Sequence, residues 1–241
     1  MKVLAVDTSS SVAAVAVMED AALLGEYLLN RGKTHSQKLV PMIKELLDAL
    51  ELLPGEIDLF AASVGPGSFT GLRIGVTTVK AMAFAAQKPV VSVPTLDALA
   101  YGIPVPGESL VCPIMDARNR QVYTALYSVE NGLLKNISGY MGVPVDELVK
   151  LIKCKSHGVI FTGDAVPAFR EALKTGLGET CEFAPPCMLT QRASTVAQLA
   201  LMKASAGELE NCFEMTPFYL RKSQAEREYD NKHGLETPGD A

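Results

Sequence analysis

The stretch that decides the fold is KVLAVDTSSSVAAVAVM, which runs from Lys2 to Met18. Residues 2–7 and 12–18 are apolar runs rich in strand-forming residues, and the small polar residues between them are typical of a hairpin turn. The first run ends on a carboxylate, Asp7. We therefore expect the chain to open with a strand, a tight polar turn and a second strand.

The residues after this hairpin alternate between helix and strand patterns. Residues 34–53 carry apolar side chains at helical spacing, and Pro54-Gly55 ends that pattern. The nearly continuous apolar run 57–64 is typical of a buried strand, and a glycine-rich turn follows it. The predicted elements of this first half are strands 2–7, 12–18, 21–29, 57–64 and 89–93, helices 34–53 and 70–87, and a helix that opens at Pro94 or Thr95.

The second half repeats this plan after a linker, 103–107, that contains proline and glycine. Its first strand again ends on an aspartate, Asp116, and a later strand again runs into glycine, at Gly163 as at Gly65. The predicted elements of this half are strands 110–116, 121–128, 133–141 and 158–162, and helices 144–153, 165–175 and 193–206.

Two copies of a strand–turn–strand opening, each followed by helix–strand alternation, predict an α/β fold with two mixed sheets flanked by helices. The architecture that matches is the duplicated actin/Hsp70/sugar-kinase (ASKHA) type. We expect an N-terminal subdomain over 1–103, a C-terminal subdomain over 108–221 and a charged, frayed tail over 222–241.

The composition excludes several classes of function. The 241 residues include 22 Lys plus Arg and 27 Asp plus Glu, a formal net charge of −5, which argues against strong, unaided binding to nucleic acid. The N-terminus alternates like a strand and not like a signal peptide, and we expect no membrane span. The five cysteines form no CxxC or zinc pattern, so we expect reduced thiols in a cytoplasmic protein.

Polar residues at the strand ends form the first candidate site. In duplicated ATPases of this architecture, a carboxylate and small hydroxyls on the first hairpin hold a metal and phosphates, and a carboxylate suits magnesium. Alternatively, Asp7 merely ends a strand and accepts hydrogen bonds from turn amides. Arg118 and Arg120 could meet phosphate or lie in a solvated turn. The candidate nucleotide-binding residues are Asp7, Thr8, Ser9, Asp116 and Gly163.

The segment GPGSFTGLRIG, residues 65–75, is the second candidate site. It lacks the GxxxxGK[ST] pattern of a P-loop, although glycines between a strand and a helix can still present amides to an anion. Gly71 and Gly75 lie four residues apart in a predicted helix, where glycine costs about 1 kcal/mol relative to alanine. Close approach of another element would offset that cost, either from the chain's own sheet or from a helix of a second subunit.

His35 begins the predicted helix 34–53 and has Leu39 at the i+4 position. A metal site on a helix needs a second ligand there. The other histidines, His157 and His233, lie far away in sequence. We therefore expect no metal site and assign His35 a polar role in the first helical turn.

Several blocks of the chain resemble the TsaB (YeaZ) family over about residues 1–226. The longest and most specific block is GPGSFTGLRIG at 65–75. The others are LAVDTS at 4–9, HSQKL with a following proline at 35–41, DAR and VY within 116–123, and PFYLR at 217–221.

The resemblance implies an ASKHA-fold protein of the bacterial machinery that forms N6-threonylcarbamoyladenosine at position 37 of tRNAs reading ANN codons. It implies a non-catalytic scaffold or activating subunit that pairs with the catalytic TsaD subunit. A TsaE-like ATPase joins this complex, and tRNA is contacted only through it. TsaD proteins hold their metal through an HxxxH pair whose second position is Leu39 here. This chain is therefore expected to have no catalytic residues and to require no cofactor.

The resemblance also implies that helices 34–53 and 70–87 contact TsaD, or a second copy of the chain in a homodimer. On this view, Gly75→Leu would weaken pairing and leave the fold largely intact. The interface residues carried over are His35, Leu39, Met42, Ile43, Leu46, Gly71, Gly75, Thr78 and Met82.

Two other functions remain as alternatives. Asp7, Asp116 and Gly163 in duplicated positions favour an autonomous ATPase or phosphotransferase of the actin/Hsp70/sugar-kinase type, with ATP as its ligand. A metallopeptidase ranks lowest, because the sequence lacks a recognisable set of metal ligands.

Overall fold

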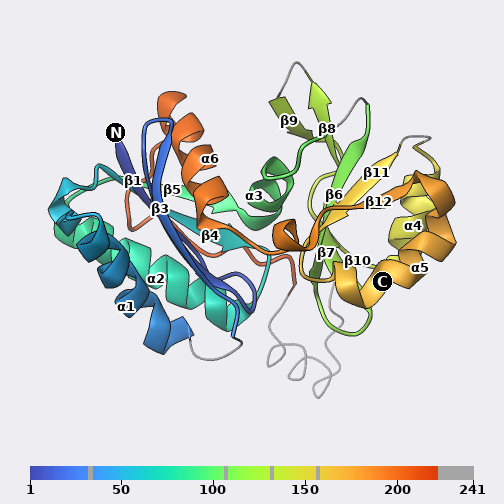
Figure 1. Ribbon diagram of the computed structural model, residues 1–241, viewed down its shortest axis with the longest axis horizontal. Helices are drawn as coiled ribbons and strands as arrows, with labels where there is room; N and C mark the ends of the chain where they lie inside the picture. Colours follow the sequence, from blue (N-terminus) through green and yellow to red (C-terminus); the bar gives the residue numbers. More distant parts are fainter. Residues whose placement is uncertain (32–34, 106–107, 131–132, 156–157, 222–241) are drawn as a thin grey trace.

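The computed structural model describes residues 1–31, 35–105, 108–130, 133–155 and 158–221. It contains two β-sheets, side by side, each with helices packed on its faces (Figure 1). The predicted tail 222–241 lies outside the described residues, as do His157 and His233.

The first sheet has the predicted hairpin at its centre. The strands β1 (Lys2–Asp7) and β2 (Ala13–Glu19) pair antiparallel, and β1 also pairs parallel with β4 (Leu59–Gly65). The outer strands are β3 (Ala22–Leu29), antiparallel to β2, and β5 (Val90–Pro94), parallel to β4. The order across the sheet is therefore β3-β2-β1-β4-β5.

The second sheet repeats this topology. Its central strand β6 (Leu110–Asp116) pairs antiparallel with β7 (Gln121–Thr124) and parallel with β11 (Val159–Thr162). The strands β10 (Met141–Pro144) and β12 (Cys181–Phe183) lie outside them, which gives the order β10-β7-β6-β11-β12. A hairpin of β8 (Tyr127–Glu130) and β9 (Leu133–Asn136) is attached to β6. The predicted duplication is confirmed.

Both faces of the first sheet are buried. In β1, Leu4 and Val6 point toward α1 (His35–Ala49) and α2 (Phe69–Ala86), whereas Val3 and Ala5 point toward α6 (Ala193–Ser205). This alternation follows from the two-residue period of a strand. It explains why the strand sequence is apolar at nearly every position.

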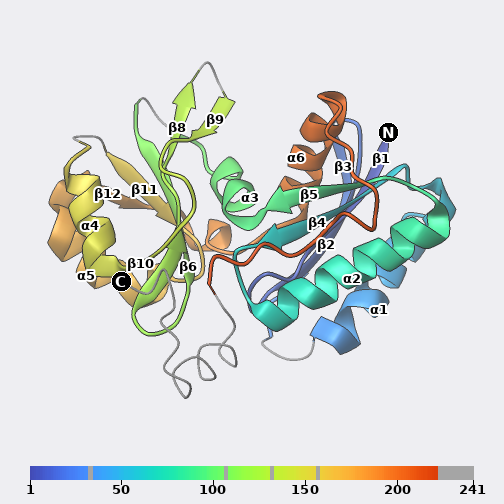
Figure 2. The same cartoon turned by 180° about the vertical axis from the view of Figure 1, so that it is seen from behind.

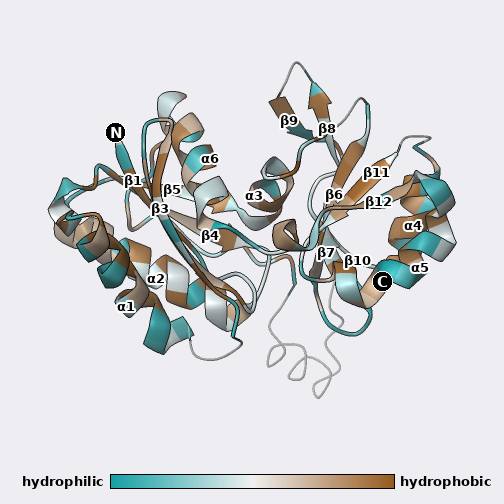
Figure 3. Cartoon of the chain, in the orientation of Figure 1, coloured by the Kyte–Doolittle hydropathy of each residue, from teal (hydrophilic) through white to brown (hydrophobic). Residues whose placement is uncertain are grey.

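The second sheet is covered in the same way. The helices α4 (Val145–Lys153) and α5 (Val166–Leu177) pack on one face around Phe161. The helix α3 (Thr95–Tyr101) packs on the other face, where Leu96 and Leu99 meet Val111. The apolar strands lie between helices whose outer sides are mostly polar (Figure 3). Short 3-10 helices occur at Pro54–Glu56, Gly178–Thr180 and Pro186–Met188.

The two halves are joined by two helices. The helix α3 follows the last strand of the first sheet and packs between the two sheets, with Ala98 in the first half's core and Leu96 and Leu99 against the second sheet. The helix α6 follows the last strand of the second sheet but packs against the first. Beyond α6, Glu210 forms a backbone bridge with Val90, and the Phe218 amide donates to Val64 O at 2.7 Å. The chain after Arg192 therefore packs mainly with the first half, although the expected C-terminal subdomain ran to residue 221, and at its end Phe218 also contacts the Tyr140 ring of the second half.

Some predicted strands differ from those in the structure. The predicted strand 121–128 is two strands, β7 and β8, separated by the buried residues Ala125 and Leu126. The chain is interrupted there because β7 pairs with β10, whereas β8 pairs with β9. The predicted strand 133–141 is β9 over its first four residues and is irregular over 137–140, and its last residue, Met141, is the first residue of β10. The three-residue strand β12 was not predicted, since a run this short carries no readable alternation.

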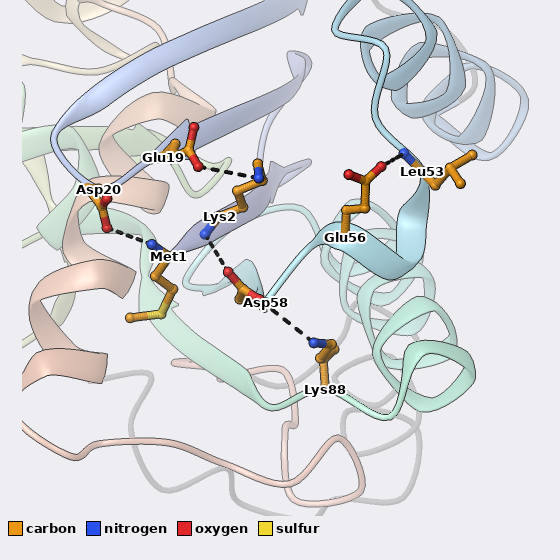
Figure 4. A network of polar contacts seen from close by, with 8 residues as sticks. All are labelled: Met1, Lys2, Glu19, Asp20, Leu53, Glu56, Asp58 and Lys88. Carbon is orange, nitrogen blue, oxygen red and sulfur yellow. Dashed lines mark hydrogen bonds and ion pairs between the residues drawn. The ribbon is translucent and has the colours of Figure 1, made fainter.

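A polar network holds the end of β1 opposite the hairpin turn (Figure 4). The Lys2 amide donates to Asp58 Oδ2 at 2.9 Å, and Lys88 Nζ lies 3.7 Å from Asp58 Oδ1. The hydrogen bond from Lys2, followed by the nearby positive charges, lowers the pKa of the Asp58 carboxyl. The network joins β1 to the segments that precede β4 and β5.

The helix α2 begins directly against the turn after β1. Ser68 caps it by accepting a hydrogen bond from the Gly71 amide at 3.3 Å. A Cβ atom on Gly71 would lie 2.0 Å from Thr8 O, and one on Gly75 would lie 2.3 Å from Thr8 Oγ1. The glycines therefore permit close packing within the chain, and the expectation that Gly75→Leu leaves the fold intact is wrong.

We expect Gly71→Ala to destabilise the protein by about 1–3 kcal/mol, because the methyl group would overlap the Thr8 carbonyl. Gly55→Ala is the matched control, since nothing lies within 4 Å of a Cβ there. Urea unfolding of both variants measures the difference. Equal stability of the two variants would show that the turn and α2 move apart without cost.

Candidate functional site

The turn after β1 is buried, and its side chains form hydrogen bonds within the turn and to neighbouring residues. The Asp7 carboxylate accepts hydrogen bonds at Oδ1 from the Ser9 amide, at 2.8 Å, and from Ser9 Oγ, at 2.6 Å. Thr8 Oγ1 donates to Gly71 O at 2.7 Å, and Ser10 Oγ donates to Gln191 Oε1 at 2.6 Å. Three of the predicted nucleotide-binding residues, Asp7, Thr8 and Ser9, are thus engaged in contacts within the chain.

The second carboxylate oxygen of Asp7 differs from the first in its hydrogen bonding. Asp7 Oδ2 is buried and accepts no hydrogen bond from the described residues. Burial raises the pKa of Asp7, and the hydrogen bonds from Ser9 partly offset that rise. Gln191 Nε2, on the other side of Ser10, is likewise buried without an acceptor among the described residues.

The glycine-rich loop packs onto this turn and does not form an open anion cradle. The Ser68 amide donates to Ser9 O at 2.6 Å. A Cβ on Gly67 would lie 2.3 Å from the same oxygen, and a Cβ on Gly65 would lie 2.2 Å from Phe218 O. Of the two interpretations of this block, packing on the chain's own elements is the one the structure bears out.

The corresponding residues of the second half lie at the ends of β6 and β11. The Asp116 amide donates to Asp164 Oδ1 at 3.2 Å, and Asp116 Oδ1 accepts from the Arg118 amide at 2.8 Å. Gly163 has a φ of +104°, and its Cα packs against Ile114 O. Gly163 therefore serves a tight turn that no other residue fits. Arg118 and Arg120 lie in an exposed turn, as the second interpretation of these arginines expected.

Asp164, which the sequence analysis did not single out, links the two halves electrostatically. Burial raises its pKa to about 6, and the charges of Asp116 and Asp7 add to the rise. The charge of Asp7, at the end of β1, therefore acts on Asp164 across the boundary between the halves. Within the described ranges, no group of three or more His, Cys, Asp or Glu residues is arranged to hold a metal ion.

His35 joins α1 to the hairpin. Its Nε2 lies 2.8 Å from Ser10 O, and Leu39 one turn later is fully buried in the core. The imidazole therefore fastens the start of α1 to the turn after β1, in the polar role expected for it.

Most of the predicted partner-interface residues are internal. Gly71 and Gly75 pack against Thr8, while Thr78 and Met82 are only half-buried. Thr78 Oγ1 donates to Ile74 O in its own helix at 2.8 Å, and Met82 packs against the core. Four residues that the resemblance assigns to an interface are buried in the first core of this chain, namely Leu39, Met42, Ile43 and Leu46.

The exposed residues of α1 and α2 are different from the buried ones described above. Large apolar side chains are exposed there, with Val40 58% exposed on α1 and Phe84 62% exposed on α2. Between Arg73 and Phe84, the outward stripe of α2 consists of Thr77 and Ala81 at helical spacing. The exposed residues of α2 therefore differ from most of those assigned to an interface from the sequence, of which only Thr78 and Met82 are partly exposed on this helix.

A segment that the sequence analysis did not place lies beside this face. Residues 208–221, here called the C-terminal strap, run along α2 from its end toward its beginning (Figure 2). Phe213 stacks edge-on against Phe84 with ring centroids 5.6 Å apart, and Tyr219 stacks on Phe69 at 4.3 Å. Lys80 Nζ donates to Met215 O at 2.7 Å.

Between α2 and the strap lies a groove of about 570 Å³, here called the α2–strap groove. The described residues that line it are Arg73, Val76, Thr77, Lys80, Ala81, Phe84, Cys212, Phe213, Met215, Thr216, Pro217 and Tyr219. It lies on the outside of the first half, away from Asp7 and Asp164.

Two sheets of equal topology, with the opening turn of each facing the other half, define a protein of the ASKHA class. Two solved structures from Pseudomonas aeruginosa share this fold. One is YeaZ, with a TM-score of 0.75 and 26% identity over 91% of this chain and 100% of that one. The other, described as similar to peptidase YEAZ, has a TM-score of 0.78 and 27% identity over 91% and 99%. Component A of (R)-2-hydroxyglutaryl-CoA dehydratase from Acidaminococcus fermentans, at 14% identity and a TM-score of 0.51, shares the fold alone.

Sequence comparison gives the family. The family model of TsaD, tRNA N6-adenosine threonylcarbamoyltransferase, matches residues 24–229. The tRNA threonylcarbamoyladenosine biosynthesis protein TsaB of Bacillus subtilis is 31% identical over 95% of this chain and 98% of its own length. TsaB of Escherichia coli is 34% identical over 55% of this chain and 58% of its own length. The chain belongs to the TsaB (YeaZ) family. None of the helices in the described ranges is long and apolar enough to cross a membrane.

We expect Asp164 to make stability depend on pH. Its pKa in the fold is about 6, above its ordinary 3.8, so the fold favours the protonated form. The contribution of Asp164 to stability is therefore greatest below about pH 4 and falls as the pH rises through 6, by about 3 kcal/mol at most. Asp164→Asn should remove this loss, as measured by urea unfolding at pH 4 and pH 7.

Glu182→Gln, on an exposed carboxylate of the same half, is the control for this comparison. It should leave the pH dependence of wild type unchanged. The same decline from pH 4 to pH 7 in Asp164→Asn as in wild type would contradict the assignment.

Proposed function

We propose that this chain is a non-catalytic subunit of the machinery that forms N6-threonylcarbamoyladenosine in tRNA. The observation that carries the proposal is the match to B. subtilis TsaB over almost the whole of both chains. We propose that a TsaD-type subunit transfers the threonylcarbamoyl group and that this chain supports it as a scaffold or activator in the cytoplasm. A TsaE-like ATPase joins the complex, and tRNA is contacted through the complex.

The state of the polar residues supports a non-catalytic role. The turn at Asp7–Ser10 and the glycine-rich loop use their polar groups on each other. The helix that would carry a metal-binding HxxxH pair has His35 bound to a backbone oxygen and a buried Leu39 in place of a second histidine. These contacts favour a structural role for the turn and for His35, with Asp7 Oδ2 as the exception considered below.

The outer face of α1 and α2 is the proposed pairing surface. Val40 on α1 and Phe84 on α2 are large apolar side chains that remain exposed, so burying them against a partner would be favourable. We propose that a TsaD-type subunit and a second copy of this chain use the same face, so the heterodimer and the homodimer compete. Val40, Thr77, Ala81 and Phe84 replace the buried residues assigned from the sequence.

Nucleotide binding between the halves is the second candidate function. One observation favours it: Asp7 Oδ2 is buried without a hydrogen-bond donor and lies within electrostatic reach of Asp164. Against it, the amide of Ser68 in the glycine-rich loop is already bonded to Ser9 O. We propose that the chain requires no cofactor, and that ATP, if it binds here, is a ligand of this space and is not hydrolysed.

Calorimetry with Mg-ATP tests whether the chain binds nucleotide. We expect no heat of binding at millimolar nucleotide for the wild-type chain. Binding that disappears in Asp7→Asn, a variant that keeps the Oδ1 acceptor for Ser9, together with release of phosphate from ATP by the wild-type chain, would favour the ATPase instead.

Reconstitution tests the proposed function. We expect the chain alone to produce no modified tRNA, and a TsaD-type subunit of the same organism to produce it faster when this chain is present. Nucleoside analysis of the tRNA by mass spectrometry measures the product. An undiminished rate without this chain would contradict the proposal.

A further inference from the structure

The α2–strap groove combines exposed aromatic side chains with a hollow surface. The rings of Phe213 and Phe84 make an edge-to-face contact beside the groove, and the two residues are 71% and 62% exposed. Pro217 and Tyr219 continue the apolar lining toward the start of α2. Aromatic side chains beside a hollow are typical of the residues that contribute most binding energy at protein interfaces.

The charged side chains of the groove all have one sign. Arg73 and Lys80 line it, and among its described lining residues there is no Asp or Glu. Neither side chain forms an ion pair with a carboxylate of the described chain, although the protein carries a net charge of −5. Arg73 donates to Tyr219 Oη and lies over the Phe69 ring, while Lys80 donates to backbone oxygens of the strap. The groove therefore offers positive charge that a partner's carboxylate would complement.

The walls of the groove are fastened in place. The strap is tied to β5 through Glu210, whose carboxylate accepts from the Ser92 amide and from Ser92 Oγ, both at 2.8 Å. Its other end is tied by the bond from the Phe218 amide to Val64 O. A preformed groove loses little conformational entropy when it is filled, which favours affinity.

We propose that the α2–strap groove docks a protein partner, which inserts a large apolar side chain beside Phe84 and Phe213 and places a carboxylate against Arg73 and Lys80. Two cations among aromatic side chains are too few to hold a nucleic-acid backbone, so the complementary occupant is an apolar and acidic segment of a protein. The inference rests on the proposed function for its partner, a TsaD-type subunit. It extends the pairing surface from α2 onto the strap.

The apolar part of the proposal is tested with Phe213→Ala in the full chain. Phe213 is largely exposed, so the variant should fold, and its thermal unfolding checks this. We expect its Kd for the TsaD-type subunit, measured by calorimetry, to rise about tenfold or more. The matched control is Leu133→Ala on β9 of the other half, which is 60% exposed and should leave the Kd unchanged.

The electrostatic part is tested at Thr77, an exposed lining residue of the groove. Thr77→Glu and Thr77→Gln add side chains of nearly equal size, and only the first adds a negative charge. We expect Thr77→Glu to weaken binding more than Thr77→Gln, with the difference shrinking at high salt. Equal Kd values for the two variants at low salt would overturn the electrostatic part.

The outcomes separate the two proposals. If wild type does not bind the TsaD-type subunit, the proposed function fails, and the docking proposal fails with it. If wild type binds and Phe213→Ala binds equally well, only the docking proposal fails.

Two other occupants would also overturn the docking proposal. Loss of self-association in Phe213→Ala, with the partner Kd unchanged, would assign the groove to a second copy. Faster proteolysis within residues 222–241 in free Phe213→Ala, again with the partner Kd unchanged, would assign it to the chain's own end.

Discussion

The contact between the turn after β1 and the first residues of α2 is the constraint on which the first half depends. Thr8 O and Ser9 O lie so close to Gly71 and Gly67 that no Cβ atom fits between them. The contact sets where α2 begins, and Ser68 caps the helix at that point. Because α2 then lies flat on the sheet, its Val76 and Val79 fill the core, while Thr77, Ala81 and Phe84 are left outside. The outer face of the helix is therefore a consequence of the glycine contacts on its inner face.

This constraint changes how the most specific block of the sequence is understood. A glycine-rich segment between a strand and a helix is typical of a phosphate site, because it can leave amides free. Here the amide of Ser68 is bonded to Ser9 O, and the glycines admit the turn itself. The carboxylate that would accompany a phosphate site, Asp7, is buried with a raised pKa. Asp7, Thr8 and Ser9, which the sequence analysis proposed as nucleotide ligands, thus use most of their hydrogen-bonding groups within the chain.

The sequence predicted the sheets better than the surfaces. Strands β1, β2, β4 and β6 are long apolar runs with polar turns after them, so their pairing and the duplication could be read from local patterns. The positions of α3, between the two sheets, and of α6, on the first sheet, could not be predicted. Local spacing shows that a helix is apolar, but it does not say which sheet the helix contacts. Leu39 and Leu46 were placed in an interface because an apolar helical stripe has the same pattern in a core and in an interface. The strap has no periodicity at all, so only the structure shows that it borders α2.

The contacts between the halves also bear on where a partner could dock. The two halves are joined through α3, whose Asp97 accepts from Tyr127 at 2.6 Å and from Tyr140 at 2.9 Å, both in the second half. The strap adds another contact, since Phe218 lies against the Tyr140 ring. A partner that separated the halves would have to break these partly buried contacts, whereas the proposed surface on α2 and the strap is already exposed. Because the strap contacts both that surface and Tyr140, a protein docked on α2 lies one side chain away from the junction between the halves.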